Sequence, residues 1–422
     1  MGVVGLRCRE CGKAFGLSPV YACDECLGPL EAVYDHAGVD AAALKARIEA
    51  GPRSIWRYAD LLPAPYDPDV DLQAGLTPLI PARRLGEALG LRRLYIKNDA
   101  LNPTWSFKDR VVSVALAAAR RFGFEVAACA STGNLANSVA AHAARAGMEA
   151  YVFIPAGLER AKVVNSAIYH PTVVEVEGTY DDVNRLCAQI ADEYSWAFVN
   201  VNLRPFYSEG AKTLAFEVAE QLGWRLPDHV VVPIASGNLL VKIAKGFEEL
   251  ASLGLVEPHR VRFSGAQAAG CNPVARAFRA GQAWVDPVRP QTIARSLAIG
   301  NPADGKYVLD IVRTTGGSVG EATDQEIVEA IALLARTEGI FTETAGGTTI
   351  AVLRRLAQEG VIDPDETVVA YVTGMGLKTP EAAEEAAVSS VRIPASLRAF
   401  ETQVLAEHRP GTPQRAPSVI TR

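Results

Sequence analysis

The sequence lacks any long apolar segment. No run approaches the roughly 18 residues that a membrane-spanning helix needs, and the first residues, Met1 to Lys13, contain no hydrophobic core of a secretion signal. Position six is Leu6, where N-myristoylation would require serine or threonine. We therefore expect a cytoplasmic protein with no membrane partner.

Basic residues are not in excess either. Lys and Arg total 42 against 48 Asp and Glu, a formal net charge of −6, which gives no overall indication of nucleic-acid binding. The six histidines show no paired ligand spacing, which disfavours catalysis by a histidine-bound metal. We expect no nucleic-acid partner.

What is present is the composition of a globular protein. The 422 residues are 49% hydrophobic and 21% charged, close to the globular average, so wholesale disorder is excluded. A chain of this length usually forms two or three domains and buries a large core without disulfides.

Four of the seven cysteines lie near the N-terminus, as the Cys-x-x-Cys pairs Cys8/Cys11 and Cys23/Cys26. Two intervening residues let a tight turn direct both thiolates to one point, and two such turns form a tetrahedral site suited to structural Zn²⁺. The alternative is a set of ordinary thiols or a ribbon without metal. Disulfides are not expected without a secretion signal.

Short β-type runs alternate with helical patterns from about Gly75 onward. The expected strands are Glu125–Ala130, Ala150–Ile154, Thr172–Val176, Ala197–Val201, Val230–Ile234, Arg260–Ser264 and Thr367–Val372. The expected helices are 134–145 (with Gly147 as its terminator), Asp181–Glu193, Gly210–Leu222, Asp324–Arg336 and Thr348–Gln358. Apolar strands separated by helices are typical of α/β folds with parallel sheets covered on both faces.

Three of these strands are followed by turns of small and polar residues. They are Ser131-Thr132-Gly133-Asn134, Ala235-Ser236-Gly237-Asn238-Leu239 and Thr373-Gly374-Met375-Gly376. Ligands of open α/β sheets bind beyond the carboxyl ends of the strands, and hydroxyl and N–H groups at a helix N-terminus attract anions. Each turn taken alone is equally consistent with an ordinary helix cap.

A fourth motif, Asn102 to Arg110, precedes an apolar helix that begins near Val111. Ser106 and Asp109 have the spacing of a capping box, so the motif is consistent with a plain helix start and a solvated Lys108. Alternatively, the positive end of the helix dipole and neighbouring aromatic rings favour a neutral, nucleophilic Lys108 suited to Schiff-base chemistry.

Together these motifs resemble the pyridoxal-phosphate enzymes of the tryptophan-synthase β-subunit fold, and among them the threonine synthases. The likeness runs from about Gly75 to Thr379, and its most diagnostic part is Asn102–Arg110. Gln73–Leu79, Glu209–Thr213 and Val372–Lys378 also look like this family. An N-terminal cysteine ribbon recurs among its longer members.

The resemblance implies a role for each motif. Lys108 would form the internal aldimine with pyridoxal 5′-phosphate, and Asn134 would bind the 3′-oxygen of the cofactor. The cofactor phosphate would be bound by Ala235, Ser236, Gly237, Asn238 and Leu239. Ser131, Thr132 and Gly133 would bind the substrate carboxylate, and Thr373 would contact the pyridine nitrogen.

The resemblance also implies an activity, the conversion of O-phospho-L-homoserine and water into L-threonine and phosphate by γ-elimination and β-hydration. The partner would thus be a phosphorylated amino acid, and a homodimer is expected because dimers are usual in this fold. The candidates for binding the substrate phosphate are Lys97, Arg110, Lys162 and Arg204, each of which could instead form an ordinary ion pair.

Three departures from the family pattern leave other functions open. Trp105 stands where glycine is usual, Met375 where asparagine is common, and Ala235 to Leu239 where many members carry a glycine-richer run. A related enzyme acting on another activated amino acid, such as a cysteate synthase using O-phosphoserine and sulfite, is the first alternative. A non-enzymatic ligand sensor with a zinc ribbon is a more distant one.

The expected architecture is therefore a two-lobed fold type II with parallel-type sheets and a small N-terminal module. Its expected parts are a zinc-ribbon-like module (1–35), a connecting segment (36–75), a large cofactor-binding domain (76–124 and 225–400), a small domain (125–224) and a flexible tail (401–422).

Overall fold

The structure, a computed structural model, describes residues 2–157, 160–178, 180–386 and 390–405. The chain divides into two compact units, Met1–Ala383 and Glu384–Arg422. The second unit contains α14 (Leu397–Phe400), whose first turn is capped by Ser396, and η7 (Glu401–Leu405). Most of the predicted tail, 406–422, lies outside the described residues.

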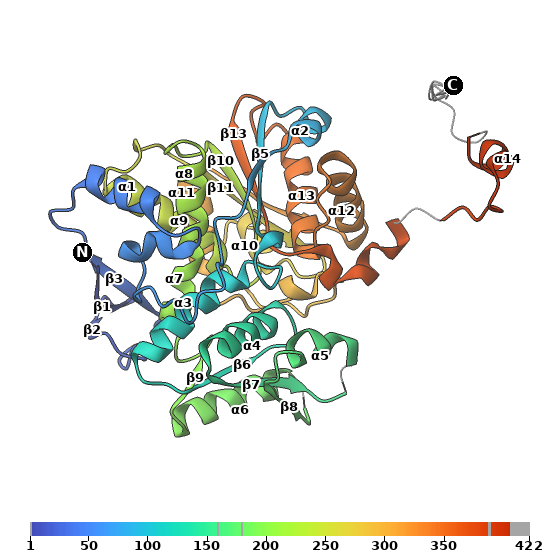
Figure 1. The fold of residues 1–422 in the computed structure, drawn as a ribbon. Helices are drawn as coiled ribbons and strands as arrows, with labels where there is room; N and C mark the ends of the chain where they lie inside the picture. Colours follow the sequence, from blue (N-terminus) through green and yellow to red (C-terminus); the bar gives the residue numbers. More distant parts are fainter. Residues whose placement is uncertain (1, 158–159, 179, 387–389, 406–422) are drawn as a thin grey trace, which may run out of the picture. The chain divides into compact units, whose positions relative to one another are not determined.

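A six-stranded sheet forms the centre of the first unit (Figure 1). Its strand order is β12 (Val319–Ala322), β11 (Arg262–Ala268), β10 (His229–Pro233), β13 (Thr367–Val372), β5 (Arg93–Asn98) and β4 (Leu79–Pro81). All neighbours are parallel except β4 and β5. The central strands β10 and β13 are almost wholly buried, as continuous apolar strands in a parallel sheet require.

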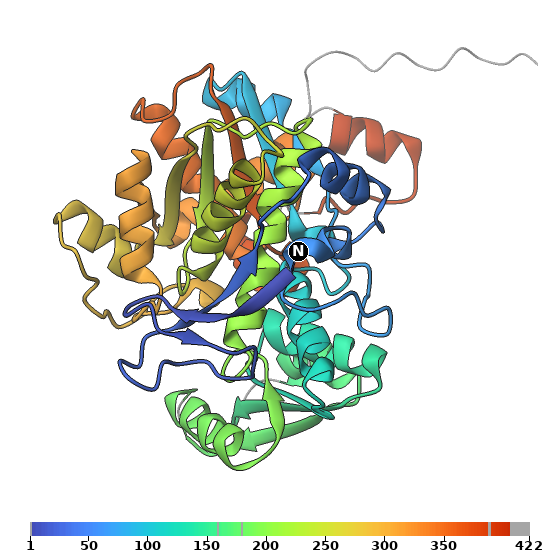
Figure 2. The same cartoon turned by 90° about the vertical axis from the view of Figure 1, so that its left-hand side faces the viewer.

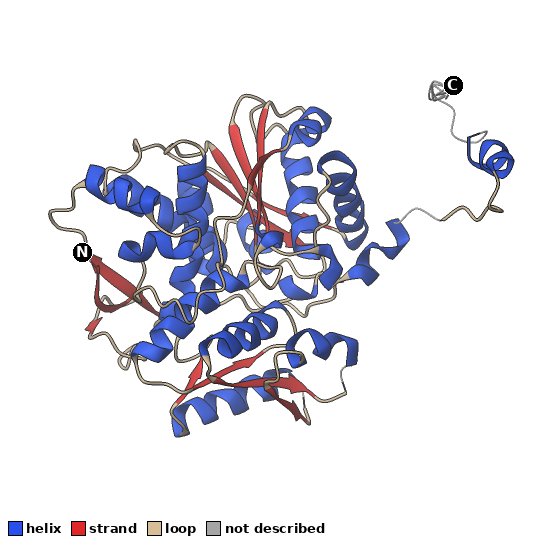
Figure 3. Ribbon diagram, in the orientation of Figure 1, coloured by secondary structure: helices blue, strands red, loops and turns tan. Residues whose placement is uncertain are grey.

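Helices cover both faces of this sheet (Figure 3). One face is covered by α13 (Thr344–Gln358), with α12 (Asp324–Glu338) and α2 (Arg83–Leu89) packed against it. The other face carries α9 (Asn238–Ser252) and α11 (Gly305–Thr315), with α8 (Thr213–Gln221) and α10 (Pro273–Arg279) beside them. The expectation of a covered parallel sheet is confirmed.

A second, four-stranded parallel sheet lies in the lower part of Figure 1. Its order is β8 (Thr172–Val176), β7 (Glu149–Pro155), β6 (Val126–Ala130) and β9 (Trp196–Phe198). It packs against α4 (Asn134–Ala146) and α6 (Tyr180–Glu193), while α5 (Arg160–Ala167) contacts α4. The helix α3 (Lys108–Arg121) connects the two sheets and contacts α4 and α7 (Arg204–Glu209).

The N-terminal residues form a small antiparallel sheet of β2 (Ala14–Phe15), β1 (Gly2–Cys8) and β3 (Leu30–Asp35), which faces the viewer in Figure 2. The strand β3 packs on α7, and the Tyr34 hydroxyl donates to Glu209 at 2.8 Å. Next come α1 (Ala41–Ala50) and the 3₁₀ segment η1 (Ile55–Leu61). The other 3₁₀ segments are η2 (Asp99–Leu101), η3 (Gly210–Lys212), η4 (Arg295–Leu297), η5 (Gly376–Lys378) and η6 (Pro380–Ala386).

Several element boundaries differ from the sequence-based expectations. The strand expected over Ala197–Val201 ends at Phe198, because the backbone then turns and the N–H of Val201 donates back to Phe198. The helix expected to begin at Thr348 begins at Thr344. No helix in the described part of the chain is long and apolar enough to cross a membrane.

Candidate active site

The turns that follow β6, β10 and β13 lie at the carboxyl ends of parallel strands, and the turn after β13 lies beside the start of α3. The turn after β13 is joined to the lysine motif by two backbone hydrogen bonds, which flank the pair Ser106 and Gly374. The N–H of Phe107 donates to the Thr373 carbonyl at 2.9 Å, and the N–H of Met375 donates to the Trp105 carbonyl at 3.0 Å. The structure therefore brings the predicted lysine and the Thr373 turn together.

Lys108 is the first residue of α3 and is half-buried. Its Nζ donates to the Tyr207 hydroxyl at 2.9 Å and lies 4.6 Å from the centre of the Phe107 ring. Tyr207 comes from α7, about 100 residues further along the chain. The amine thus lies beside two aromatic rings and is hydrogen-bonded to one of them, and its role as a nucleophile stays a prediction.

The capping box predicted for Ser106 and Asp109 is not formed. The Asp109 carboxylate accepts hydrogen bonds from the backbone and hydroxyl of Thr104, both at 2.7 Å, and from Ser138 at 2.7 Å. The Ser106 Oγ is buried and has no hydrogen-bond partner among the described residues. Asp109 thus fixes the loop before Lys108 instead of capping the helix.

Trp105 occupies a backbone conformation that explains why glycine is usual at this position. Its φ is +66°, in the left-handed region, where a side chain costs roughly 1–2 kcal/mol. The ring is 48% exposed. The tryptophan therefore keeps the turn that the lysine motif needs, and its ring points toward solvent rather than into the core.

Asn134 begins α4 and contacts a residue that the sequence reasoning missed. Its amide donates to both carboxylate oxygens of Glu343, at 3.1 and 3.0 Å. Burial raises the pKa of Glu343, although the Asn134 hydrogen bond and the positive charges of Lys378 and Lys108 oppose this effect. In the sequence, the one indication of a role for Glu343 is that it is an isolated acidic residue in a run of apolar and small residues immediately before a helix.

The turn after β13 is shaped around this carboxylate. A Cβ at Gly374 would lie 2.5 Å from Oε1 of Glu343, and the Glu343 N–H donates to the Gly374 carbonyl at 3.1 Å. Thr373 is buried, and its hydroxyl makes no hydrogen bond to another described residue. The hydroxyl is therefore available to a group bound in the site.

The turn after β10 has the properties of a phosphate cradle. Gly237 has φ +95°, and α9 begins at the next residue, Asn238, without a side-chain cap. The first backbone N–H groups of a helix lack partners within the helix and point toward an anion bound there. A Cβ at Gly237 would come within 2.8 Å of Val308, so only glycine fits. Ala235, Ser236 and Leu239 complete the predicted segment.

The turn after β6 also leaves a helix N-terminus open. Thr132 and Gly133 are exposed, Ser131 is half-buried, and Gly133 precedes α4 without a side-chain cap. The Thr132 hydroxyl therefore does not serve as the helix cap. The Ser131 hydroxyl accepts only a long contact, 3.4 Å, from the Gly133 N–H.

Three candidates for substrate-phosphate binding are engaged elsewhere. Lys97 is fully buried and donates to Glu217 at 2.6 Å, and Arg110 is fully buried between Asp99 and Glu217. Both are structural, because their positive charges are neutralised inside the core. Arg204 pairs with Asp304 at 3.1 Å. The side chain of Lys162 lies outside the described residues.

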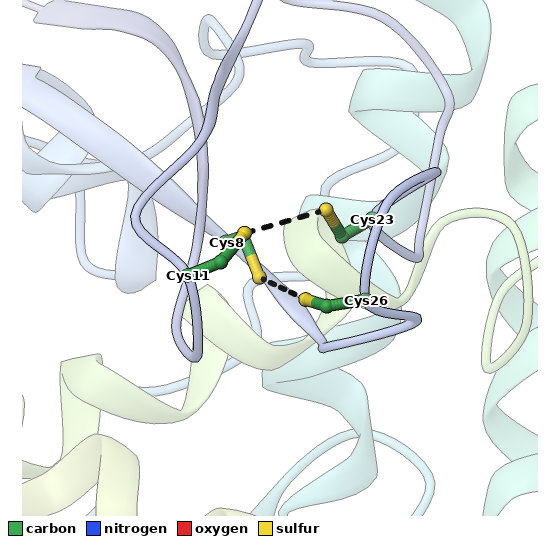
Figure 4. A group of neighbouring side chains, drawn as sticks. All are labelled: Cys8, Cys11, Cys23 and Cys26. Carbon is green, nitrogen blue, oxygen red and sulfur yellow. Dashed lines mark hydrogen bonds between the residues drawn. The ribbon is translucent and has the colours of Figure 1, made fainter.

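The four N-terminal cysteines converge on one point (Figure 4). Their Sγ atoms all lie within 4.8 Å of one another, with Cys8–Cys26 at 3.4 Å and Cys11–Cys23 at 3.6 Å. A tetrahedron with Zn–S bonds of about 2.3 Å has edges of about 3.8 Å, whereas a disulfide would need about 2.05 Å. The sulfur arrangement fits a zinc ion.

Comparison with known proteins identifies the family. A family model described as "Pyridoxal-phosphate dependent enzyme" matches residues 70–374. The threonine synthase of Methanocaldococcus jannaschii is 39% identical over 390 residues, 92% of this chain and 96% of the relative. The threonine synthase of Methanosarcina acetivorans is 37% identical over 379 residues, 89% of this chain and 92% of the relative. The chain belongs to the threonine synthase family.

Solved structures of other proteins share the fold. A threonine deaminase from Solanum lycopersicum superposes with a TM-score of 0.63 at 20% identity, covering 84% of this chain and 97% of the deaminase. A maize serine racemase superposes with a TM-score of 0.63 at 19% identity, covering 82% and 95%. The predictions of a fold type II α/β architecture and of a pyridoxal-phosphate-dependent lyase are confirmed.

Proposed function

We propose that this chain converts O-phospho-L-homoserine and water into L-threonine and phosphate, with pyridoxal 5′-phosphate bound at Lys108. The observation that carries the proposal is the backbone pairing of the lysine motif, at Trp105 and Phe107, with the turn after β13, in a chain aligned over nearly its whole length with threonine synthases. The non-enzymatic sensor interpretation has no support in these findings.

The residues of the site fit this cofactor. The N–H groups around Gly237 and Asn238 would hold its phosphate, the Asn134 amide its 3′-oxygen, and the Thr373 hydroxyl its ring nitrogen. When bound, the cofactor supplies an electron sink for charge that develops at Cα of the substrate. A threonine hydroxyl does not hold a proton on the ring as a carboxylate would, which moderates the sink and favours elimination and replacement over racemisation.

Lys108 is the proposed acid and base. Its Nζ would remove the proton at Cα and then one at Cβ, so that phosphate leaves from Cγ. A proton would be delivered to Cγ, water would add its hydroxyl at Cβ, and a proton would return to Cα. The Tyr207 hydroxyl, 2.9 Å away, orients this amine. Ser131, Thr132 and Gly133 would hold the substrate carboxylate at the N-terminus of α4, which orients Cα toward Lys108.

The four-cysteine site is proposed to bind structural Zn²⁺. Cys8, Cys11, Cys23 and Cys26 supply four sulfur ligands and leave no open position for a substrate. A three-stranded sheet as small as this one has little core of its own, so metal binding would contribute much of its folding free energy. The homodimer and the cytoplasmic location remain predictions.

Phosphate release tests the substrate assignment. Purified protein supplied with pyridoxal 5′-phosphate is assayed with O-phosphohomoserine, with O-phosphoserine in the presence and absence of sulfite, and with O-phosphothreonine. We expect turnover of O-phosphohomoserine alone, with threonine as product. Turnover of O-phosphoserine with sulfite, and none of O-phosphohomoserine, would instead favour the cysteate synthase alternative.

Lys108→Ala is the matched test of the cofactor assignment. The wild-type protein is expected to absorb at roughly 410–430 nm when loaded, and the variant is expected to lose this band. Lys13→Ala, a change in a lysine paired within the ribbon, should keep it. Absence of the band in wild-type protein supplied with cofactor would overturn the proposal.

A further inference from the structure

Asp304 joins three segments that are far apart in the sequence. Its carboxylate pairs with Arg204 at 3.1 Å and lies 3.8 Å from Arg9 of the N-terminal module. Its backbone N–H donates to the Ser236 carbonyl at 2.9 Å, in the turn proposed to hold the cofactor phosphate. The four-cysteine module and the phosphate turn therefore meet at one buried residue.

The carboxylate of Asp304 makes these contacts instead of capping α11, the helix that it precedes. Asp304 is the N-cap residue of α11, where an aspartate usually accepts a hydrogen bond from the first turn, but its side chain makes no such bond. The side chain is only 4% exposed. A buried carboxylate requires compensation by positive charge, and Arg204 and Arg9 provide it.

The phosphate turn is packed directly on Asp304. A Cβ built at Gly237 would lie 3.1 Å from the Asp304 Cβ, so the turn has almost no free space on this side. A movement of Asp304 would therefore displace the Ser236 carbonyl and the N–H groups beside it. An uncompensated negative charge at Asp304 would also repel a phosphate bound in the turn.

The ribbon contacts α11 through the residues between its first two cysteines. The Arg9 guanidinium lies 3.6 Å from the centre of the Tyr307 ring, and Glu10 binds both the Tyr307 hydroxyl and Lys306. The turn that presents Arg9 is closed by a hydrogen bond from the Gly12 N–H to the Cys8 carbonyl at 3.1 Å. The geometry of the cysteine turn thus sets the position of Arg9.

We propose that metal occupancy of the four-cysteine site strengthens binding of the cofactor phosphate, through Arg9 and Asp304. This inference rests on the proposed function, because the ligand of the Ser236–Gly237 turn is the phosphate of pyridoxal 5′-phosphate. The coupling is reciprocal, since a ligand that raises the affinity for a second ligand is itself bound more tightly in its presence. Arg9 and Asp304 are positioning residues and contact neither ligand.

The test measures cofactor affinity rather than turnover. Full-length protein is prepared with Zn²⁺ and after treatment with a zinc chelator, and the zinc content and the folded state of each sample are measured. Each sample is titrated with pyridoxal 5′-phosphate and followed by cofactor absorbance. The variants are Arg9→Gln and Asp304→Asn, and the control is Lys13→Gln, whose side chain pairs with Asp24 and Glu25 and lies over the Phe15 ring, all inside the ribbon.

We expect removal of zinc to weaken cofactor binding about fivefold or more in the wild type and in the Lys13→Gln control, the usual size of coupling between sites. In zinc-loaded Arg9→Gln the affinity for pyridoxal 5′-phosphate should already be lower than in the zinc-loaded wild type. In both Arg9→Gln and Asp304→Asn, removal of zinc should change this affinity less than about twofold. The reciprocal measurement, competition of cofactor-loaded protein with a chelator, should show slower zinc loss in the wild type than in Arg9→Gln.

Two results would overturn the inference while leaving the proposed function intact. They are equal cofactor affinity of folded wild-type protein with and without zinc, and a zinc effect in Arg9→Gln as large as in the wild type. Failure of every sample to bind the cofactor would overturn the proposed function, and the coupling with it.

Discussion

The Asn134 amide donates to both carboxylate oxygens of Glu343, and so connects the first residue of α4 to the residue that precedes α13. The two residues are 209 positions apart in the sequence. Because the Glu343 backbone N–H also donates to the Gly374 carbonyl, Glu343 connects the start of α4 to the turn that follows β13. This pair is the central polar contact of the candidate active site.

Replacing Glu343 by glutamine should alter the pH dependence of stability. Burial raises the pKa of Glu343 in the folded state, so the folded protein binds more protons than the unfolded chain above the ordinary glutamate pKa. The free energy of unfolding should then fall as pH rises through this window. Glu343→Gln should lose less stability between pH 5 and pH 8 than the wild type in urea denaturation. The exposed Glu329→Gln is the control, and a wild-type pH profile in Glu343→Gln would contradict the prediction.

Tyr207→Phe should slow turnover without releasing the cofactor. The change removes the hydroxyl that accepts a hydrogen bond from the Lys108 Nζ at 2.9 Å and keeps the ring. A hydrogen bond contributes about 0.5–1.5 kcal/mol, so kcat should fall roughly 2- to 10-fold. Cofactor absorbance should remain, which separates this effect from unfolding. Unchanged kcat would show that the hydroxyl does not orient the amine.

Gly237→Ala should weaken cofactor binding and destabilise the fold. The position combines φ +95° with a Cβ site 2.8 Å from Val308. The left-handed conformation alone costs roughly 1–2 kcal/mol, and the clash adds to it. Gly90→Ala is a matched control, because Gly90 has φ +75° but open space around its Cβ site. The cofactor dissociation constant should rise in Gly237→Ala only, and an equal rise in both variants would argue against a phosphate cradle.

His229 should make the protein less stable in acid. Burial, and then the positive charge of Arg262, lower the pKa of His229 to about 4, against about 6.5 in an unfolded chain. Between these values the unfolded chain binds more protons, so stability rises with pH and is lost as pH falls from 6.5 to 4. The loss attributable to His229 is on the order of 3 kcal/mol.

His229→Gln should therefore flatten the stability profile between pH 6.5 and 4, as measured by urea denaturation at a series of pH values. His170→Gln, a change in an exposed histidine, is the control and should follow the wild type. A His229→Gln profile as steep as that of the wild type would show that other groups cause the loss of stability in acid.

Most of the fold could be predicted because its pattern is local. Apolar and β-branched runs predicted β6, β8, β10 and β13 within one or two residues of their observed bounds. Gly147 terminates α4 in the left-handed conformation, as expected. The predictions were wrong where contacts with other segments determine the local structure. At Phe198, β9 stops pairing with β6. Asp109 accepts hydrogen bonds from Thr104 and Ser138 rather than capping α3.

The sequence by itself determined the alternation of strands and helices, the lysine motif, the turns after the strands and the paired cysteines, because each is encoded within a few consecutive residues. Only the tertiary structure decided that Glu343 accepts hydrogen bonds from Asn134 and that Tyr207 accepts one from Lys108. It also decided that Lys97 and Arg110 each form a buried ion pair with an acidic residue. The proximity of Arg9 to Asp304 likewise appears only in the folded chain. These contacts join segments far apart in the chain. They depend on the order of strands in the sheet, which places β13 between β10 and β5 and which no local pattern contains.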